Sequence, residues 1–307
     1  FVKINDVYIT NKQESSIYSL TKDTLAKADA YTAKLSSTGS LQWHKTLDSD
    51  DGVEYVEFNK ILADGKSIYV VGINKPNSSL LDAYNPDIIL AKYTESTDGL
   101  SASLTLQKSY AGISGSSRAD HVTSIAKLSD TRIVIGGYTN TNSSNPFDAY
   151  LATLDTTGTF AIKRKIASSE SEKVVDLKVV DGDIYFLMET AATSTSDDIN
   201  VSFGKATVGT SAIAVEFIKE YTNTVNSFVD SCFTVDEFNE FYITSVLRLK
   251  SDDTTKTSYW IGKVDTDGDV LYSKSYAVTG GNITMSSGSS IDIFGDLNLA
   301  FSQVDST

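Results

Sequence analysis

Carboxylates are the most abundant groups in this chain that could carry out acid–base chemistry. The 307 residues include 40 Asp and Glu but only 26 Lys and Arg, so the formal net charge is −14. Hydrolysis of a glycosidic bond needs two carboxyl groups at a set separation. Acids recur at matched positions of apolar segments, Glu57 with Asp230 and Glu54 with Asp120, whereas Asp176 and Asp292 fall elsewhere. Because 40 acids make such matches common by chance, catalysis by these groups is the weaker interpretation.

Residues for nucleophilic or zinc chemistry are scarce. His44 and His121 are the only histidines, and His44 lies in an alternating segment where it is expected to face solvent. Cys232, the only cysteine, lies in an apolar segment and is expected to be a buried small side chain. The chain has no Ser-His-Asp spacing, zinc-protease motif, P-loop or dinucleotide fingerprint. We therefore predict that the protein is not an enzyme and has no cofactor.

One short acidic segment is a candidate metal site. It reads Asp265-Thr-Asp267-Gly-Asp269, which loosely resembles the start of a calcium-binding loop. A full calcium loop has its Gly two positions later and a Glu six residues after that Gly, and this segment has neither. Turn formation is the favoured interpretation, with calcium binding as the alternative.

Four Asn-x-Ser/Thr sequences could accept glycans if the chain is secreted by a eukaryote. Their asparagines are Asn77, Asn142, Asn200 and Asn282. The abundance of Ser and Thr would produce a similar number by chance, so only their placement is informative. Asn200 is expected at the start of a strand, and the other three are expected in loops.

These groups must be positioned by a β structure, because one hairpin pattern recurs five times. Its clearest copy runs from Asp148 to Ile166, two short strands joined by an Asp-Thr-Thr-Gly turn. The second strand of each copy alternates and carries a base, at Lys45, Lys108, Arg164, Lys219 and Lys274. The first strand carries a small residue, at Ala33, Ala91, Ala152, Gly204 and Gly262. The bases predict a protected outer edge, and the small residues predict close approach of a neighbouring sheet.

Two further strand types complete each repeat. One type follows a turn and has six copies, at 7–9, 68–70, 133–135, 184–186, 241–243 and 297–299. The other precedes the turn and has five copies, at 56–62, 122–128, 174–180, 228–235 and 289–293. Four antiparallel strands repeated in tandem are typical of a β-propeller blade. We predict an all-β, single-domain propeller over residues 1–307, most simply with five blades and alternatively with six.

The repeat resembles the secreted bacterial propeller repeats of the SBBP type. The resemblance rests on a D-A-F/Y-V-A-K-L-like strand, seen as Asp148-Ala-Tyr-Leu-Ala, followed by a Gly turn and an outer strand that contains aromatic residues. It covers nearly the whole chain and implies a secreted propeller, but it identifies a repeat and not a function.

The chain has one strand more than five closed blades require. Segments 3–10 and 296–302 compete for one place, beside the outer strands 30–35 and 41–47. The surplus strand could pack within the chain or belong to an incomplete sixth blade. If it stays unpaired, its edge is a template for assembly with another subunit. The candidate assembly residues are Val7, Tyr8, Ile9, Leu297 and Leu299. We therefore expect a closing or donated strand at 1–11, repeats at 12–302 and a tail at 303–307.

Charge and composition limit the partners. A strongly acidic surface repels nucleic-acid phosphates and anionic lipids, and no run of some twenty apolar residues could span a membrane. Phe1 fits a mature chain after signal removal or an excised fragment. We predict a non-catalytic, glycosylated, extracellular or cell-surface structural protein that assembles with itself as an oligomer or filament. A carbohydrate-binding propeller is the alternative, and a propeller glycosidase ranks third.

Overall fold

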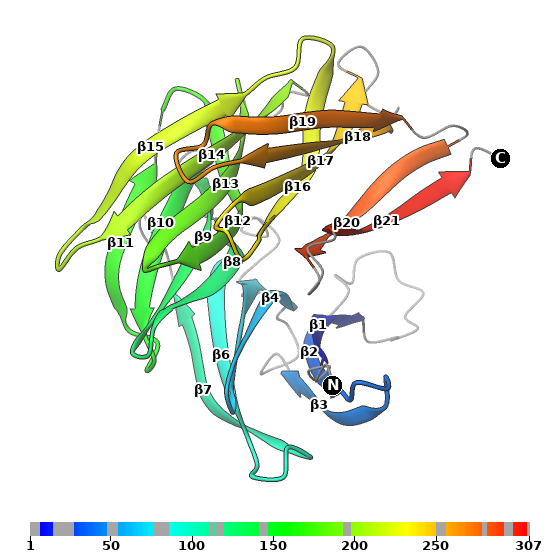
Figure 1. The fold of residues 1–307 in the computed structure, drawn as a ribbon. Helices are drawn as coiled ribbons and strands as arrows, with labels where there is room; N and C mark the ends of the chain where they lie inside the picture. Colours follow the sequence, from blue (N-terminus) through cyan, green and yellow to red (C-terminus); the bar gives the residue numbers. More distant parts are fainter. Residues whose placement is uncertain are drawn as a thin grey trace, which may run out of the picture. The chain divides into compact units, whose positions relative to one another are not determined.

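A computed structural model describes twelve parts of the chain. They are residues 7–14, 28–47, 55–75, 86–110, 113, 119–140, 147–166, 168–192, 198–249, 256–277, 281–291 and 297–305. Every regular element within them is a β strand, and 21 strands are present (Figure 1). The chain divides into two compact units, residues 1–141 with 154–160 and residues 142–153 with 161–307.

Four complete blades confirm the prediction of an all-β propeller with four-stranded sheets. In each blade, every strand pairs with the next strand along the chain. The first blade contains β4 (Tyr55–Asp64), β5 (Ser67–Lys75), β6 (Asp87–Glu95) and β7 (Ala102–Tyr110). The second contains β8 (Asp120–Ser129), β9 (Arg132–Asn140), β10 (Phe147–Asp155) and β11 (Phe160–Ile166). The third contains β12 (Ser171–Val180), β13 (Asp183–Ala191), β14 (Ile199–Val208) and β15 (Ile213–Tyr221), and the fourth β16 (Asn226–Val235), β17 (Phe241–Leu249), β18 (Lys256–Val264) and β19 (Val270–Ala277).

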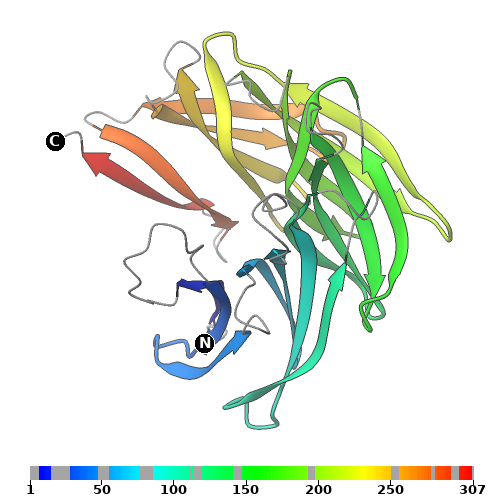
Figure 2. The same ribbon diagram turned by 180° about the vertical axis from the view of Figure 1, so that it is seen from behind.

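The two ends of the chain form incomplete groups of strands. β1 (Val7–Glu14) pairs with β2 (Ala28–Leu35) over eight residues, and β3 (Leu41–Leu47) pairs with the other edge of β2. β20 (Gly281–Ile291) and β21 (Leu297–Asp305) form a two-stranded sheet and lie side by side in both views (Figures 1 and 2). Of the two segments that compete for the place beside β2, β1 occupies it. Pairing of either strand with another subunit stays a prediction, as does the single domain over residues 1–307.

A β-bulge lies in the first strand of every complete blade. The registers shift between Phe58 and Lys60, between Val122 and Ser124, between Val174 and Asp176, and between Val229 and Cys232. A bulge adds residues to one strand and re-aims their side chains. Relative to the bulge of its own strand, Glu57 lies before the bulge, whereas Asp230 lies within it. The predicted match between those two acids is therefore wrong.

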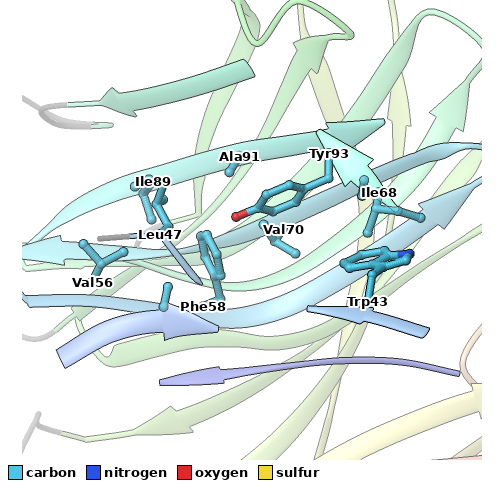
Figure 3. Close-up of a cluster of buried hydrophobic side chains, with 11 residues drawn as sticks. Trp43, Leu47, Val56, Phe58, Ile68, Val70, Ile89, Ala91 and Tyr93 are labelled. Carbon is cyan, nitrogen blue, oxygen red and sulfur yellow. The ribbon is translucent and has the colours of Figure 1, made fainter. Parts of the chain in front are cut away.

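The core of the first unit is formed by side chains from β2 to β7. Figure 3 shows the rings of Trp43, Phe58 and Tyr93 among aliphatic side chains of neighbouring strands. A buried polar group is enclosed with them, because Trp43 Nε1 donates to Glu95 Oε1 at 2.8 Å and Lys34 Nζ lies 3.0 Å from the same oxygen. Burial raises the pKa of Tyr93 to about 12. Residues distant in sequence thus share one core.

The core of the second unit is aromatic. Phe203 of β14 and Phe241 of β17 have ring centroids 5.1 Å apart, and Tyr185 of β13 lies 4.4 Å from Phe241. Phe233 of β16 meets Phe203 edge to face at 5.8 Å. Offset and edge-to-face pairs of this kind add stability beyond the area they bury. These rings join the third blade to the fourth.

Candidate functional site

The candidate site lies in the second unit, where β12 begins, β13 ends and β16 approaches its bulge. Lys173 of β12 and Glu189 of β13 are direct partners in the antiparallel register. Side chains of directly opposed residues project from the same face of a sheet. The pairing of β12 with β13 alone therefore makes the base and the acid neighbours, without any contribution from the next blade.

Glu189 is a half-buried carboxyl group held by the next blade. The backbone N–H of Ser231 donates to Glu189 Oε1 at 3.3 Å. Burial raises the pKa of Glu189, and the nearby negative charge of Asp230 raises it further, although the hydrogen bond from Ser231 and the charge of Lys173 oppose this rise. A carboxyl group in this environment keeps its proton to a higher pH than an exposed one.

Asp230 is exposed and has an unusual backbone conformation. Its φ is 53°, one of three positive values at non-glycine residues in the described part of the chain. Left-handed backbone costs free energy for residues with a side chain, less so for Asp, and persists where the surrounding structure enforces it. The bulge between Val229 and Cys232 supplies that enforcement. As a result, Asp230 is turned out to solvent beside Glu189.

Hydrogen bonds of two serine hydroxyls stabilise the bulge. Ser231 Oγ lies 2.9 Å from Ser245 Oγ, and Ser245 Oγ donates to the carbonyl of Val229 at 3.1 Å. Both serines are buried. Their hydrogen bonds satisfy polar groups that the interrupted strand ladder leaves without cross-strand partners. Ser231 therefore contributes its amide to Glu189 and its hydroxyl to the scaffold.

Lys173 completes the group. Burial lowers the pKa of Lys173, and the negative charge of Glu189 opposes this change. Its Nζ lies 4.6 Å from the ring centroid of Phe147, an arrangement in which the ring face attracts the cation. The site thus combines one shielded carboxyl group, one exposed carboxylate and one amine. Such a set can donate a proton, accept a proton and orient a polar substrate.

The other acids proposed from the sequence have different roles. Asp176 is buried and accepts hydrogen bonds from the backbone N–H groups of Leu177 and Phe233, at 3.0 and 3.3 Å, so it supports the bulge of β12. Asp120 accepts from the N–H of Ile113 at 2.9 Å. Glu57 is half-buried on β4. Glu54 and Asp292 lie outside the described residues.

The acidic segment from Asp265 to Asp269 is a hydrogen-bonded turn. Asp265 Oδ1 accepts from the backbone N–H groups of Asp267 and Asp269, at 3.0 and 2.8 Å. Asp269 also forms an ion pair with Lys219 at 2.5 Å. In the described part of the chain, no three His, Cys, Asp or Glu side chains are grouped to hold a metal ion. Calcium binding at these three residues remains a prediction that the geometry does not favour.

The two histidines and the cysteine have contacts of their own. His44 stacks on Tyr31 with ring centroids 5.8 Å apart, and His121 stacks on Tyr138 at 4.5 Å. The predicted exposure of His44 and burial of Cys232 are confirmed. Cys232, which follows Ser231 at the end of the bulge, lies with its Sγ 3.1 Å from Thr244 Oγ1.

The candidate glycan acceptors are only partly described. Asn77 and Asn142 lie outside the described residues. Asn200 is near the start of β14, as predicted, and its Nδ2 donates to Glu220 Oε1 at 2.9 Å. Asn282 lies in β20, opposite Val304, so its predicted loop position is wrong. Glycan attachment, self-association, carbohydrate binding and the lack of nucleic-acid partners all stay predictions.

Sequence reasoning missed the two residues at the centre of the site. Glu189 lies in the run Leu187-Met188-Glu189 at the end of a buried strand, and Lys173 is a single base before an apolar pair. An acid that interrupts an apolar strand was the available signal, because burying an unpaired charge is costly. Their pairing required the register of β12 and β13, which the pattern alone does not reveal.

Comparison with known proteins supports the fold. No known protein family and no curated protein matches the sequence. A protein of unknown function from Dyadobacter fermentans has a similar structure, with a TM-score of 0.54, 10% identity, and coverage of 90% of this chain and 81% of that one. An endo-arabinase from Bacteroides thetaiotaomicron has a TM-score of 0.43 and 14% identity over 78% of this chain and 87% of its own. A GH32 beta-fructofuranosidase from Bombyx mori has a TM-score of 0.42 and 9% identity over 89% and 60%, respectively.

These similarities define the class as β-propeller and correct two predictions. At 9 to 14% identity they show the fold alone. The structures similar to this chain include an endo-arabinase and a fructofuranosidase. The comparisons therefore count against the predictions that the chain is not an enzyme and that it is a non-catalytic structural protein, and neither prediction is kept. The described residues also include no helix long and apolar enough to cross a membrane.

Proposed function

We propose that the chain is a hydrolase that cleaves a glycosidic bond at the Glu189 and Asp230 site. One observation carries the proposal: two neighbouring carboxyl groups occupy different environments. Glu189 is shielded and has a raised pKa, whereas Asp230 is exposed on a bulge that holds it in a left-handed conformation. Environments that separate the pKa values of two carboxyl groups also separate their roles as acid and base.

In this reaction Glu189 is the proton donor. Its proton moves to the departing oxygen as the bond from that oxygen to the anomeric carbon breaks. Asp230 acts from the solvent side, either by attacking the anomeric carbon or by taking a proton from an attacking water. Lys173, opposite Glu189, donates hydrogen bonds to substrate hydroxyl groups. The net charge of −14 favours neutral saccharides over anionic ones.

A panel of nitrophenyl glycosides of neutral sugars tests the proposal. The wild-type chain should release nitrophenol from at least one member, and Glu189→Gln should lower kcat by about 100-fold or more. Asp230→Asn should lower it as well, and Asp267→Asn, at an exposed turn residue, is the matched control. The anomeric configuration of the first product distinguishes direct attack by Asp230 from attack by water. Absence of turnover across the panel, or full activity of Glu189→Gln, would refute the proposal.

An extracellular location and an SBBP-type repeat are the finer parts of the same proposal. They are supported by the Asp148-Ala-Tyr strand, which forms the predicted third strand of a blade as β10, with a Gly turn between β10 and β11. Fractionation of the native cells tests the location. Recovery of the chain from the cytoplasm would contradict it.

A further inference from the structure

A buried carboxylate of the third blade contacts the strand that carries Asp230. This group is Asp176 of β12, which is only 7% exposed at the seam where the third blade meets the fourth. Its Oδ2 accepts the backbone N–H of Phe233 at 3.3 Å. Because β16 pairs with β17 on one edge only, an N–H on its other edge needs a partner outside its own sheet. Asp176 is that partner for Phe233.

Two side chains of the third blade bind amides of β16 that lie two residues apart. Glu189 Oε1 accepts the N–H of Ser231 at 3.3 Å, and Asp176 accepts the N–H of Phe233. Backbone N–H groups alternate between the two edges of a strand, so these two point to the same edge. The edge of β16 that faces the third blade is therefore fixed at two successive points, and Phe233 lies beyond the bulge.

The bulged segment is fixed on both sides. Before the bulge, Ser245 Oγ donates to the carbonyl of Val229 at 3.1 Å. After it, Phe233 is fixed by its amide and by its ring, which packs edge to face on Phe203. Asp230 lies between these points with a φ of 53°, a conformation that persists where the surrounding structure enforces it. Loss of one fixed point should therefore let the bulge relax.

The carboxylate of Asp176 is itself held in place. Its Oδ1 accepts the N–H of Leu177 at 3.0 Å, and Lys178 Nζ lies 3.4 Å from its Oδ2. A hydrogen bond from a backbone N–H to a carboxylate is about twice as strong as one to a neutral acceptor. Asp176 is thus a fixed and strong acceptor for the amide of Phe233.

The other complete blades show what sets Asp176 apart. We compared the first residue that resumes cross-strand pairing after the bulge. That place is taken by Asp176 in β12, Lys60 in β4, Ser124 in β8 and Cys232 in β16. The bulges of these three other strands form without an acid at this place, so forming a bulge does not require one. The acid occurs in the blade whose neighbour carries Asp230.

We propose that Asp176 is a positioning residue of the proposed hydrolase: through the amide of Phe233, it fixes the bulge that presents Asp230 beside Glu189. Asp176 does not itself contact the substrate. The catalytic consequence rests on the proposed function, whereas the effect of Asp176 on the bulge can be measured without any substrate.

Hydrogen exchange followed by NMR measures that effect. Asp176→Leu removes the acceptor, so exchange at the amides of Ser231 and Phe233 should become about tenfold faster or more. Asp176→Asn keeps one acceptor oxygen and should show a smaller change. Asp183→Asn is the matched control, because it loses an ion pair with Lys205 in the same blade and should leave these amides unchanged. Circular dichroism checks that each variant is folded.

Kinetics with the glycoside that the wild-type chain cleaves measures the catalytic consequence. Asp176→Leu should lower kcat by about ten- to hundredfold with little change in KM, because Asp230 is displaced. It should also shift the pH dependence of kcat. The hydrogen bond from Ser231 lowers the pKa of Glu189 more than the charge of Asp230 raises it. Loss of both should therefore raise this pKa, and the alkaline limb of the kcat profile should move to higher pH.

The possible results separate this proposal from the hydrolase. Unchanged exchange at Ser231 and Phe233 in Asp176→Leu would overturn it, whether or not a glycoside is cleaved. Equal exchange in Asp176→Leu and Asp176→Asn would overturn the hydrogen-bond mechanism in favour of the charge pair with Lys178. Faster exchange with unchanged kcat would overturn the positioning role and leave the hydrolase intact. If the wild-type chain cleaves no glycoside, the hydrolase alone is refuted, and faster exchange would still identify Asp176 as the residue that fixes the bulge.

Discussion

Replacing Tyr221 by Phe should weaken the seam between the third and fourth blades. The hydroxyl of Tyr221, on β15, donates to the carbonyl of Gly268, in the turn between β18 and β19, at 2.8 Å. Burial is the main cause that raises the pKa of Tyr221, so the hydroxyl is shielded from water. Removing a donor from a buried acceptor costs about 1 to 3 kcal/mol. Because Tyr221 is only half-buried, we expect a loss of about 1 to 2 kcal/mol in the free energy of unfolding.

Tyr276→Phe is the matched control, since it occupies the equivalent place on β19. Its hydroxyl is exposed and lies 3.4 Å from that of Tyr272, so its removal should change stability by less than about 0.5 kcal/mol. Urea denaturation measures both variants, and hydrogen exchange should speed up at the amides of Gly268 and Asp269 in Tyr221→Phe alone. Equal destabilisation of the two variants would refute the reasoning, because the loss of stability would then come from removing a tyrosine hydroxyl and not from losing its hydrogen bond to the carbonyl of Gly268.

Three further predictions concern buried groups. Glu95→Gln should lower the free energy of unfolding by about 3 to 5 kcal/mol, because it leaves the buried Lys34 without its counter-charge, whereas Glu220→Gln at an exposed site should have little effect in the same urea assay. Gly204→Ala should cost about 1 to 3 kcal/mol, since its Cβ would lie 2.4 Å from Phe186 Cζ, and Gly209→Ala, with 3.4 Å to its nearest atom, should be tolerated in thermal melting. Because the pKa of Glu189 is raised in the folded chain, the folded state binds this proton more tightly than the unfolded state does. Its contribution to the free energy of unfolding should therefore fall as pH rises from 4.5 through the raised pKa. Glu189→Gln should flatten this part of the plot of unfolding free energy against pH, and an unchanged plot would contradict the assignment.

The strands of this fold could be predicted because strand alternation and turn residues are local properties of the sequence. Alternation with a Gly turn identified the hairpin of 148–166, which the structure divides into Phe147–Asp155 and Phe160–Ile166. The reason for the small residue that recurs in the first strand of each hairpin was harder to predict. At Gly204 the space is filled by the ring of Phe186, its direct cross-strand partner, and not by a neighbouring sheet.

The candidate site could not be predicted because it depends on register. The bulge of β16 places one extra residue in the strand, since Asp230 and Ser231 together face Ser245, and this turns Asp230 towards solvent and the N–H of Ser231 towards Glu189. Such an insertion leaves only a short break in alternation, which is common in any strand pattern. The acid on the neighbouring strand was equally hidden, because β13 brings Glu189 opposite Lys173 only once its pairing with β12 is known.

The base that recurs in the second strand of each hairpin also has different roles in different copies. Lys219 of β15 does not protect an edge, because it forms an ion pair with Asp269 in the turn of the next hairpin. The same column on β19 contains Tyr272, Lys274 and Tyr276, yet its neighbours Val270 and Leu271 are 47% and 52% exposed. The described strands after β19 form the β20 and β21 pair alone, with no outer hairpin to supply a turn. Within the described part of the second unit, no turn covers β19 as the turn between β18 and β19 covers Tyr221, so the exposure of Tyr272 gives no independent support for a carbohydrate-binding platform.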